Sequence, residues 1–205
     1  MTRTLRALAA LLSYPDEALR AALPEVRDCA PREALPLADE IAQSGLYEAQ
    51  ERYVALFDRS RALSLHLFEH VHGETRERGQ AMVELAQMYQ LHGMSVAGHE
   101  LPDYLPAFLE FASLVDEAKE LLGQIAHILR ALGDRLAERG SPYCTVFAAL
   151  LAAAGERGLS KARVAPVRAA EDLLALERSW MDPEVTFGGP QPVRLYRKGE
   201  LAGMT

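Results

Sequence analysis

The chain has 205 residues, of which 49% are apolar and 25% are charged, and its formal net charge is -7 at pH 7. This composition is typical of a soluble globular protein that buries a core, organised as one domain or as one domain with a tail. The acidic balance argues against sequence-independent nucleic-acid binding, which needs a clustered basic surface, and favours a basic peptide as partner.

Residues 2–12 are predicted to form a first amphipathic helix, because the leucines of this segment repeat at helical spacing. The segment also imitates a secretory signal, with two arginines before a short apolar run, but it lacks a small-x-small cleavage site. Nowhere does the sequence approach the roughly 18 uninterrupted apolar residues of a membrane helix. We therefore expect a cytoplasmic protein with no stable membrane insertion.

Prolines at helix starts and glycines at helix ends divide the rest of the chain. Pro24 is expected to end or kink the second helix, and residues 116–139 form the longest periodic run. The predicted helices after the first cover residues 15–24, a segment from Pro31 or Pro36 to Gly45, residues 46–57 and 74–91, a segment from Pro102 or Pro106 through Val115, and residues 116–139, 141–151 and 167–180.

No alternating run of β-branched residues marks a strand, so the expected fold class is all-α, a single-domain irregular helical bundle. We expect one helical domain over residues 1–180 and a mobile tail over residues 181–205, where prolines and glycines leave no period. Cys29 and Cys144 lack CxxC spacing and are interpreted as small core residues in a reducing compartment.

Residues 63–106 are the distinctive part of the chain, because histidine, aromatic, glycine and acidic residues concentrate there. From Gly79 through Ala118 the sequence contains no lysine or arginine. A local field of one sign follows, and it favours a basic ligand. The acidic residues of this cation-free stretch are Glu84, Glu100, Asp103, Glu110, Asp116 and Glu117.

Residues 66–70 read HLFEH and match the HxxEH pattern of inverted zinc peptidases, in which two histidines bind zinc and the glutamate acts as base. A zinc site also needs a third protein ligand, and no later segment indicates one. A zinc hydrolase that uses His66, Glu69 and His70 remains an alternative. The favoured interpretation is that these are polar residues at a loop and helix start, or part of a partner surface, with no enzyme activity and no metal.

Three stretches carry a family resemblance: YVALF at 53–57, LHLFEHVHGETRERGQAM at 65–82 and ELPDYLP at 100–106. Together they resemble the delta-chain assembly chaperones of respiratory nitrate reductase, the NarJ type, within the wider TorD, DmsD and NarJ group of redox-enzyme maturation chaperones. The tail sequence EVTF at 184–187 also resembles this family.

The resemblance implies an all-helical cytoplasmic chaperone that is absent from the finished enzyme and holds no cofactor of its own. Its partner would be the apo catalytic subunit of nitrate reductase, bound through a basic, twin-arginine-like N-terminal segment. The subunit would be held open for molybdenum cofactor and iron-sulfur insertion before membrane attachment. A helical subunit built permanently into a larger complex is the remaining alternative.

The resemblance also implies a peptide groove around the ELPDYLP corner. Tyr104 stands where the family commonly has histidine, so an aromatic or hydroxyl contact is carried over and an imidazole role is not. The groove would be lined by Glu100, Pro102, Asp103 and Tyr104, with Tyr53, Phe57, Phe68, Glu69 and His70 nearby.

The residues alone point to the same corner, because a helical peptide in a groove is held by apolar anchors and steered by opposite charge. Tyr89, Tyr104, Phe108 and Phe111 are candidate anchors within the cation-free stretch. A purely structural interpretation stays open, in which the aromatic residues are core and the acidic residues favour a helix start through the helix dipole. Likewise, Arg76 and Arg78 either make local pairs with Glu74 and Glu77 or extend the site.

Overall fold

The computed structural model describes residues 1–72, 76–96 and 100–160, all of which belong to one compact unit, Met1–Val167. In these ranges the chain is helical, and its only extended pairing is one isolated β-bridge. The α-helices are α1 (Thr2–Leu12), α2 (Glu17–Cys29), α3 (Leu35–Gln43), α4 (Leu46–Tyr53), α5 (Leu67–Val71), α6 (Arg76–Leu91), α7 (Leu105–Ala112), α8 (Ala118–Gln124), α9 (Ala126–Glu138) and α10 (Cys144–Ala154).

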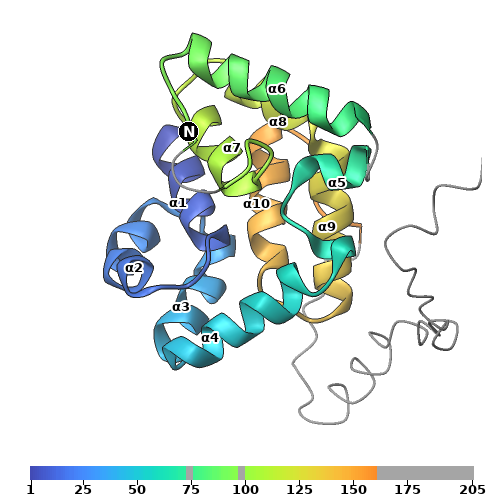
Figure 1. Ribbon diagram of the computed structural model, residues 1–205. Helices are drawn as coiled ribbons and strands as arrows, with labels where there is room; N and C mark the ends of the chain where they lie inside the picture. The colour runs from blue at the N-terminus through green and yellow to red at the C-terminus, as the bar shows by residue number, and fades with distance from the viewer. Residues whose placement is uncertain (73–75, 97–99, 161–205) are drawn as a thin grey trace, which may run out of the picture. The chain divides into compact units, whose positions relative to one another are not determined.

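Helices α1 and α10 form the centre of the bundle (Figure 1). Helix α1 packs against α2, α7 and α10, and four of its leucines are fully buried. Helix α10 also contacts α8 and α9, and it is apolar on nearly every face, as expected of a helix surrounded by others. The buried leucines of α1 are Leu5, Leu8, Leu11 and Leu12.

The close contact between α9 and α10 depends on one glycine. A Cβ atom added to Gly133 would lie 2.9 Å from the Cβ of Phe147, and it would also collide with the side chain of Leu159. At the end of α10, Gly155 adopts a left-handed conformation with φ of 78°, the usual helix stop. Close packing therefore favours glycine at position 133, and the left-handed backbone conformation favours glycine at position 155.

The all-α prediction is confirmed in the described residues, but several helix bounds differ from those predicted, and two of the differences have a clear physical cause. Pro24 was expected to end or kink α2, and the helix continues through it to Cys29. Pro24 is exposed, whereas Leu23 and Val26 on either side of it are buried, so the packing of its neighbours holds the helix together across the proline. The spacing of apolar residues predicts which face of a helix is buried, but it does not predict whether a helix continues through a proline.

The second error concerns residues 116–139, which form two helices rather than one. Helices α8 and α9 are separated at Ile125, whose φ of -98° and ψ of 5° interrupt the helix. Because both helices pack on α10, their apolar residues keep a common period across the break. A one-residue interruption of this kind leaves no mark on the pattern.

The region between α4 and α5 departs from regular helix. Helix α4 continues directly into a π-helical turn, Val54–Asp58, within the predicted helix 46–57. The predicted helix 167–180, the predicted tail 181–205 and the EVTF sequence lie outside the described residues. In the part of the chain that is described, no helix combines the length and the apolar character needed to span a membrane.

Candidate peptide-binding site

The two most distinctive sequence motifs lie side by side in the fold. His66 and Tyr104 form an antiparallel β-bridge. On either side of it, the backbone amide of Leu67 donates to the carbonyl of Asp103 at 2.9 Å, and the amide of Leu105 donates to the carbonyl of Leu65 at 2.8 Å. The LHLFEH and LPDYLP stretches are therefore two halves of one structural unit, which we call the motif unit.

Asp103 caps helix α5 from the other motif. Its side chain is fully buried, and its Oδ2 accepts a hydrogen bond from the amide of Phe68 at 3.1 Å. The first amides of a helix have no partner within the helix. A carboxylate at this end accepts their hydrogen bonds, and its negative charge interacts favourably with the helix dipole. Since the Asp103 carbonyl accepts from Leu67, this one residue satisfies the first two amides of α5.

The buried carboxylate also faces an imidazole and a guanidinium group. Nδ1 of His66 lies 3.1 Å from Asp103 Oδ1, and a guanidinium nitrogen of Arg78 lies 3.8 Å from Oδ2. The hydrogen bond with Asp103 raises the pKa of His66, although partial burial of the ring acts in the opposite direction. A guanidinium nitrogen of Arg78 also lies 3.3 Å from Oε1 of Glu69, so Arg78 contacts the carboxylates of both Glu69 and Asp103.

Tyr104 connects the motif unit to a cluster of aromatic rings. Its hydroxyl lies 2.9 Å from the hydroxyl of Tyr53, which donates to the carbonyl of Leu12 at 2.9 Å. Burial raises the pKa of both tyrosines, so both hydroxyls remain protonated. The rings of Phe57 and Tyr143 pack at 5.0 Å beside Tyr53.

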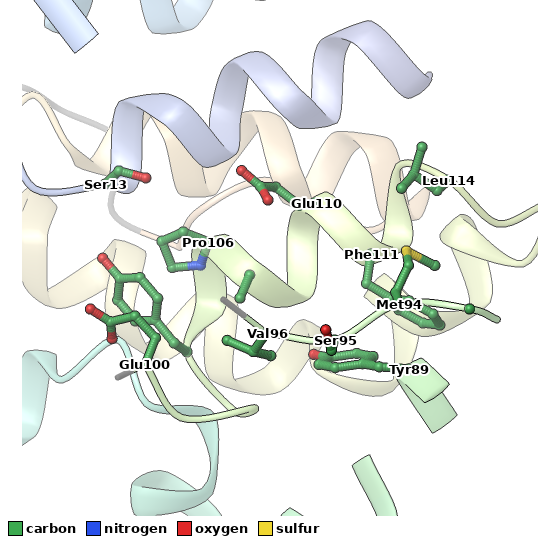
Figure 2. A pocket seen from close by; sticks show the side chains of 13 residues that line it. Ser13, Tyr89, Met94, Ser95, Val96, Glu100, Pro106, Glu110, Phe111 and Leu114 are labelled. Atoms are coloured by element: carbon green, nitrogen blue, oxygen red, sulfur yellow. The ribbon is translucent and has the colours of Figure 1, made fainter. Parts of the chain in front are cut away.

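A pocket of about 560 Å³ opens beside Tyr104 (Figure 2). Its walls come from the end of α1, the end of α6 with the following loop, the ELPDYLP corner and α7. Tyr89 fixes one wall by donating its hydroxyl to the carbonyl of Pro102 at 2.9 Å. The lining residues are Ser13, Tyr89, Gly93, Met94, Ser95, Val96, Glu100, Tyr104, Pro106, Ala107, Glu110, Phe111 and Leu114.

The pocket combines an apolar surface with negative charge. Its charged lining residues are Glu100 and Glu110, which are both exposed. The described lining contains no lysine or arginine. In the described ranges neither glutamate has an ion-pair partner within 4.0 Å, whereas Glu69 and Asp103 pair with Arg78. An apolar cavity with unpaired carboxylates is suited to a ligand that is both apolar and cationic.

The structure distributes the predicted site residues over three places. Glu100 and Tyr104 line the pocket. Pro102 supplies the carbonyl bound by Tyr89, Tyr53 lies one hydrogen bond behind Tyr104, and Phe57 is buried beside Tyr53. The remaining predicted residues, Asp103, Glu69, His70 and Phe68, belong to the motif unit and its helix α5.

None of these last four residues lines the pocket beside Tyr104. Nε2 of His70 lies 2.8 Å from the carbonyl of Ser64, where it holds the start of the motif unit. Phe68 lines a separate, largely apolar groove of about 350 Å³ between α5, α6, α7 and α8. Of the candidate anchors, Tyr89 and Phe111 line the pocket beside Tyr104, and Phe108 lines the separate groove.

Sequence reasoning did not select several residues that form the pocket. Met94 and Val96 belong to a loop without a period, so nothing in the sequence indicates that they turn toward α7. Glu110 was visible only as one of six acidic residues in the cation-free stretch. Its position one helical turn after Pro106 was the available signal, because both then share a face of α7.

The HxxEH residues are engaged in hydrogen bonds within the motif unit. His66 contacts Asp103 through Nδ1, and His70 contacts the Ser64 carbonyl through Nε2. Across residues 1–72, 76–96 and 100–160, no group of three or more histidine, cysteine, aspartate or glutamate side chains is arranged to hold a metal ion.

Comparison with known proteins identifies the family. The family model described as "Nitrate reductase delta subunit" matches residues 13–149, which is more than half of the chain. The chain belongs to this family. Within it, the chain is 39% identical to NarW of Escherichia coli, described as a probable nitrate reductase molybdenum cofactor assembly chaperone, over 89% of this chain and 83% of that protein.

A second relative gives the same result. The nitrate reductase molybdenum cofactor assembly chaperone NarJ of Escherichia coli is 38% identical over 86% of this chain and 81% of its own length. These relatives of the delta subunit family are assembly chaperones and not catalytic enzymes. The crystal structure of a redox enzyme maturation protein from Archaeoglobus fulgidus aligns with a TM-score of 0.55 over 73% of this chain and 91% of that one, at 23% identity, and it supports the fold.

Proposed function

We propose that this protein is a system-specific chaperone for the apo catalytic subunit of a respiratory nitrate reductase. It binds the basic N-terminal segment of that subunit in the cytoplasm. It holds the subunit open for insertion of the molybdenum cofactor and the iron-sulfur cluster before membrane attachment. The chaperone itself catalyses no bond chemistry.

Membership of the delta subunit family and the names of the two relatives support the chaperone part of this proposal. The observation that carries the peptide-binding part is the pocket beside Tyr104. It combines apolar walls with two carboxylates that lack an ion-pair partner among the described residues. Such a site favours an amphipathic helical segment with positive charge, anchored by apolar contacts and attracted by the opposite sign.

The predicted site residues have a graded role in this proposal. Glu100 and Tyr104 contact the peptide directly. Tyr53, Phe57 and Pro102 hold the pocket wall, and Asp103 attaches the ELPDYLP corner to α5. His70 contacts the Ser64 carbonyl and Glu69 pairs with Arg78, and both contacts support α5. Phe68 lies in the neighbouring groove, where it extends the apolar surface available to the client.

Isothermal titration calorimetry of the full chain with a synthetic peptide of the client's N-terminal segment tests the proposal. We expect saturable binding that weakens as salt is added, since exposed charges are screened over about 10 Å at 0.1 M ionic strength. The scrambled peptide of the same composition is the control. Absence of binding at low ionic strength would reject the proposal, provided that circular dichroism shows the chain to be folded.

Co-purification distinguishes a chaperone from a permanent subunit. A chaperone is recovered with cofactor-poor catalytic subunit and is absent from the mature membrane complex. A permanent subunit is recovered with both. Molybdenum analysis of each fraction assigns the state of the catalytic subunit independently of its activity.

A further inference from the structure

We infer that the charge of the pocket is supplied by Glu100 together with Glu110, and that this pair selects a client helix with a cation at one end of an apolar face. The inference rests on the proposed function and specifies its ligand. It assigns a specificity role to Glu110, and it gives Asp103 a structural role.

Pairing and exposure separate the acidic residues near the motif unit into two classes. Asp103 is fully buried and is committed to the amide of Phe68 and to His66. Glu69 is committed to Arg78. A carboxylate already neutralised by a protein cation has little attraction left for a ligand cation, and a fully buried one cannot reach it.

Glu100 and Glu110 differ from these residues in both respects. Each is exposed and lines the pocket, and in the described ranges neither has an ion-pair partner within 4.0 Å. The carboxylate of Glu100 is close enough to the Tyr104 hydroxyl to contribute to the raised pKa of that tyrosine. Because the walls around them are largely apolar, their field is less screened than that of carboxylates on an open surface.

The pocket has distinct ends. In the view of Figure 2, the two carboxylates lie toward the side formed by Pro106, whereas Met94, Phe111 and Leu114 lie toward the opposite side. The chain order agrees with this, since Glu110 follows Pro106 by one turn of α7, and Leu114 lies four residues later in the turn after the end of α7. The side chain of Leu114 is 61% exposed, which leaves it open to cover by a ligand.

A ligand that matches both ends carries a lysine or arginine one or two turns from apolar side chains on the same helix face. The apolar side chains bind against Met94, Phe111 and Leu114, and the cation binds between Glu100 and Glu110. A neutral amphipathic helix would lose the charge contact, and a basic peptide without an apolar face would lose the anchor.

A double-mutant cycle by calorimetry at low ionic strength tests this assignment. The protein variants are Glu110→Gln, Glu100→Gln and the double variant. The peptides are the client's N-terminal segment and the same segment with its lysines and arginines replaced by glutamine. Glu117→Gln is the matched control, because it removes an equal charge from an exposed residue of the same cation-free stretch that lines neither the pocket nor the separate groove.

We expect each pocket variant to weaken binding of the cationic peptide by about threefold to tenfold, and the double variant to weaken it more. Binding of the neutral peptide should stay unchanged in all variants, and Glu117→Gln should have no effect on either peptide. Adding salt should erase the difference between wild type and the double variant.

Equal loss for cationic and neutral peptides, or no loss in the double variant, would overturn the assignment of the charge pair. The proposed function would survive that result if the wild-type chain still bound the cationic peptide. Failure of the wild-type chain to bind either peptide would reject the proposed function instead.

Discussion

The carboxylate of Asp103 accepts a hydrogen bond from the backbone amide of Phe68 at 3.1 Å, so the aspartate of one motif caps the helix that begins in the other. Arg78, from helix α6, faces the same carboxylate at 3.8 Å. These contacts attach the ELPDYLP corner to α5 and α6, and the exposed side of the corner forms part of the pocket. This arrangement explains why the two motifs belong together.

Replacement of Asp103 should be costly. We expect Asp103→Ala to lower the free energy of unfolding by about 2 to 4 kcal/mol, because it removes a buried cap and leaves the Phe68 amide, the His66 imidazole and the Arg78 guanidinium without their acceptor. Asp103→Asn should lose less, since one oxygen can still accept from Phe68. Urea unfolding measures both. Glu100→Ala, at an exposed site, should stay within about 0.5 kcal/mol of wild type. Equal stability of the Asp103→Ala and Glu100→Ala variants would contradict the capping role.

The hydroxyl chain from Tyr104 through Tyr53 to the carbonyl of Leu12 supports the pocket wall. We expect Tyr104→Phe to cost about 1 kcal/mol, because one neutral hydrogen bond is lost. Tyr53→Phe should cost more, since it removes both bonds and leaves the Leu12 carbonyl unpaired. The double variant should lose less than the sum of the single losses, because the two residues share one bond. Strict additivity in thermal or urea unfolding would mean that the hydroxyls do not interact.

The pair of His66 and Asp103 makes stability depend on pH. The hydrogen bond with Asp103 raises the pKa of His66 in the folded state above its ordinary value of 6.5. Protonated His66 therefore stabilises the fold fully below pH 6.5, and this contribution is lost as pH rises through the raised folded-state pKa.

Unfolding free energies measured across this range should fall toward higher pH, and His66→Gln should remove that part of the slope. The matched control is His127→Gln, because His127 is an exposed histidine on α9. A slope that persists in His66→Gln and disappears in His127→Gln would contradict the assignment.

Two helix glycines should respond in opposite directions to the same substitution. Gly133→Ala places a methyl group 2.9 Å from the Cβ of Phe147, which cannot rotate away, so we expect a loss of about 1 to 3 kcal/mol. Nothing lies within 4 Å of a Cβ at Gly123, so Gly123→Ala should stabilise α8 by up to about 1 kcal/mol. Thermal unfolding of the two variants and wild type gives the comparison. A stabilising Gly133→Ala would mean that α9 and α10 are not in close contact.

The predictions that succeeded rest on local regularities of the chain. Helical spacing of leucines predicted α1 at its observed bounds, and the motif order indicated the family that the comparison then established. The errors occurred where tertiary packing overrides a local rule. Exposure of Pro24 lets α2 continue, and common packing on α10 conceals the break at Ile125.

The sequence by itself determined the helical class, the family and the presence of an acidic stretch without cations. Only the tertiary structure decided which carboxylates of that stretch face solvent. Asp103 and His66 are 37 residues apart in the chain, and their pairing buries one acidic residue while Glu100, three residues earlier, stays exposed. The physical reason is that burial and charge pairing depend on partners from distant segments of the chain. Helix formation depends on the spacing of residues within a few turns of one segment, so it can be predicted from the sequence.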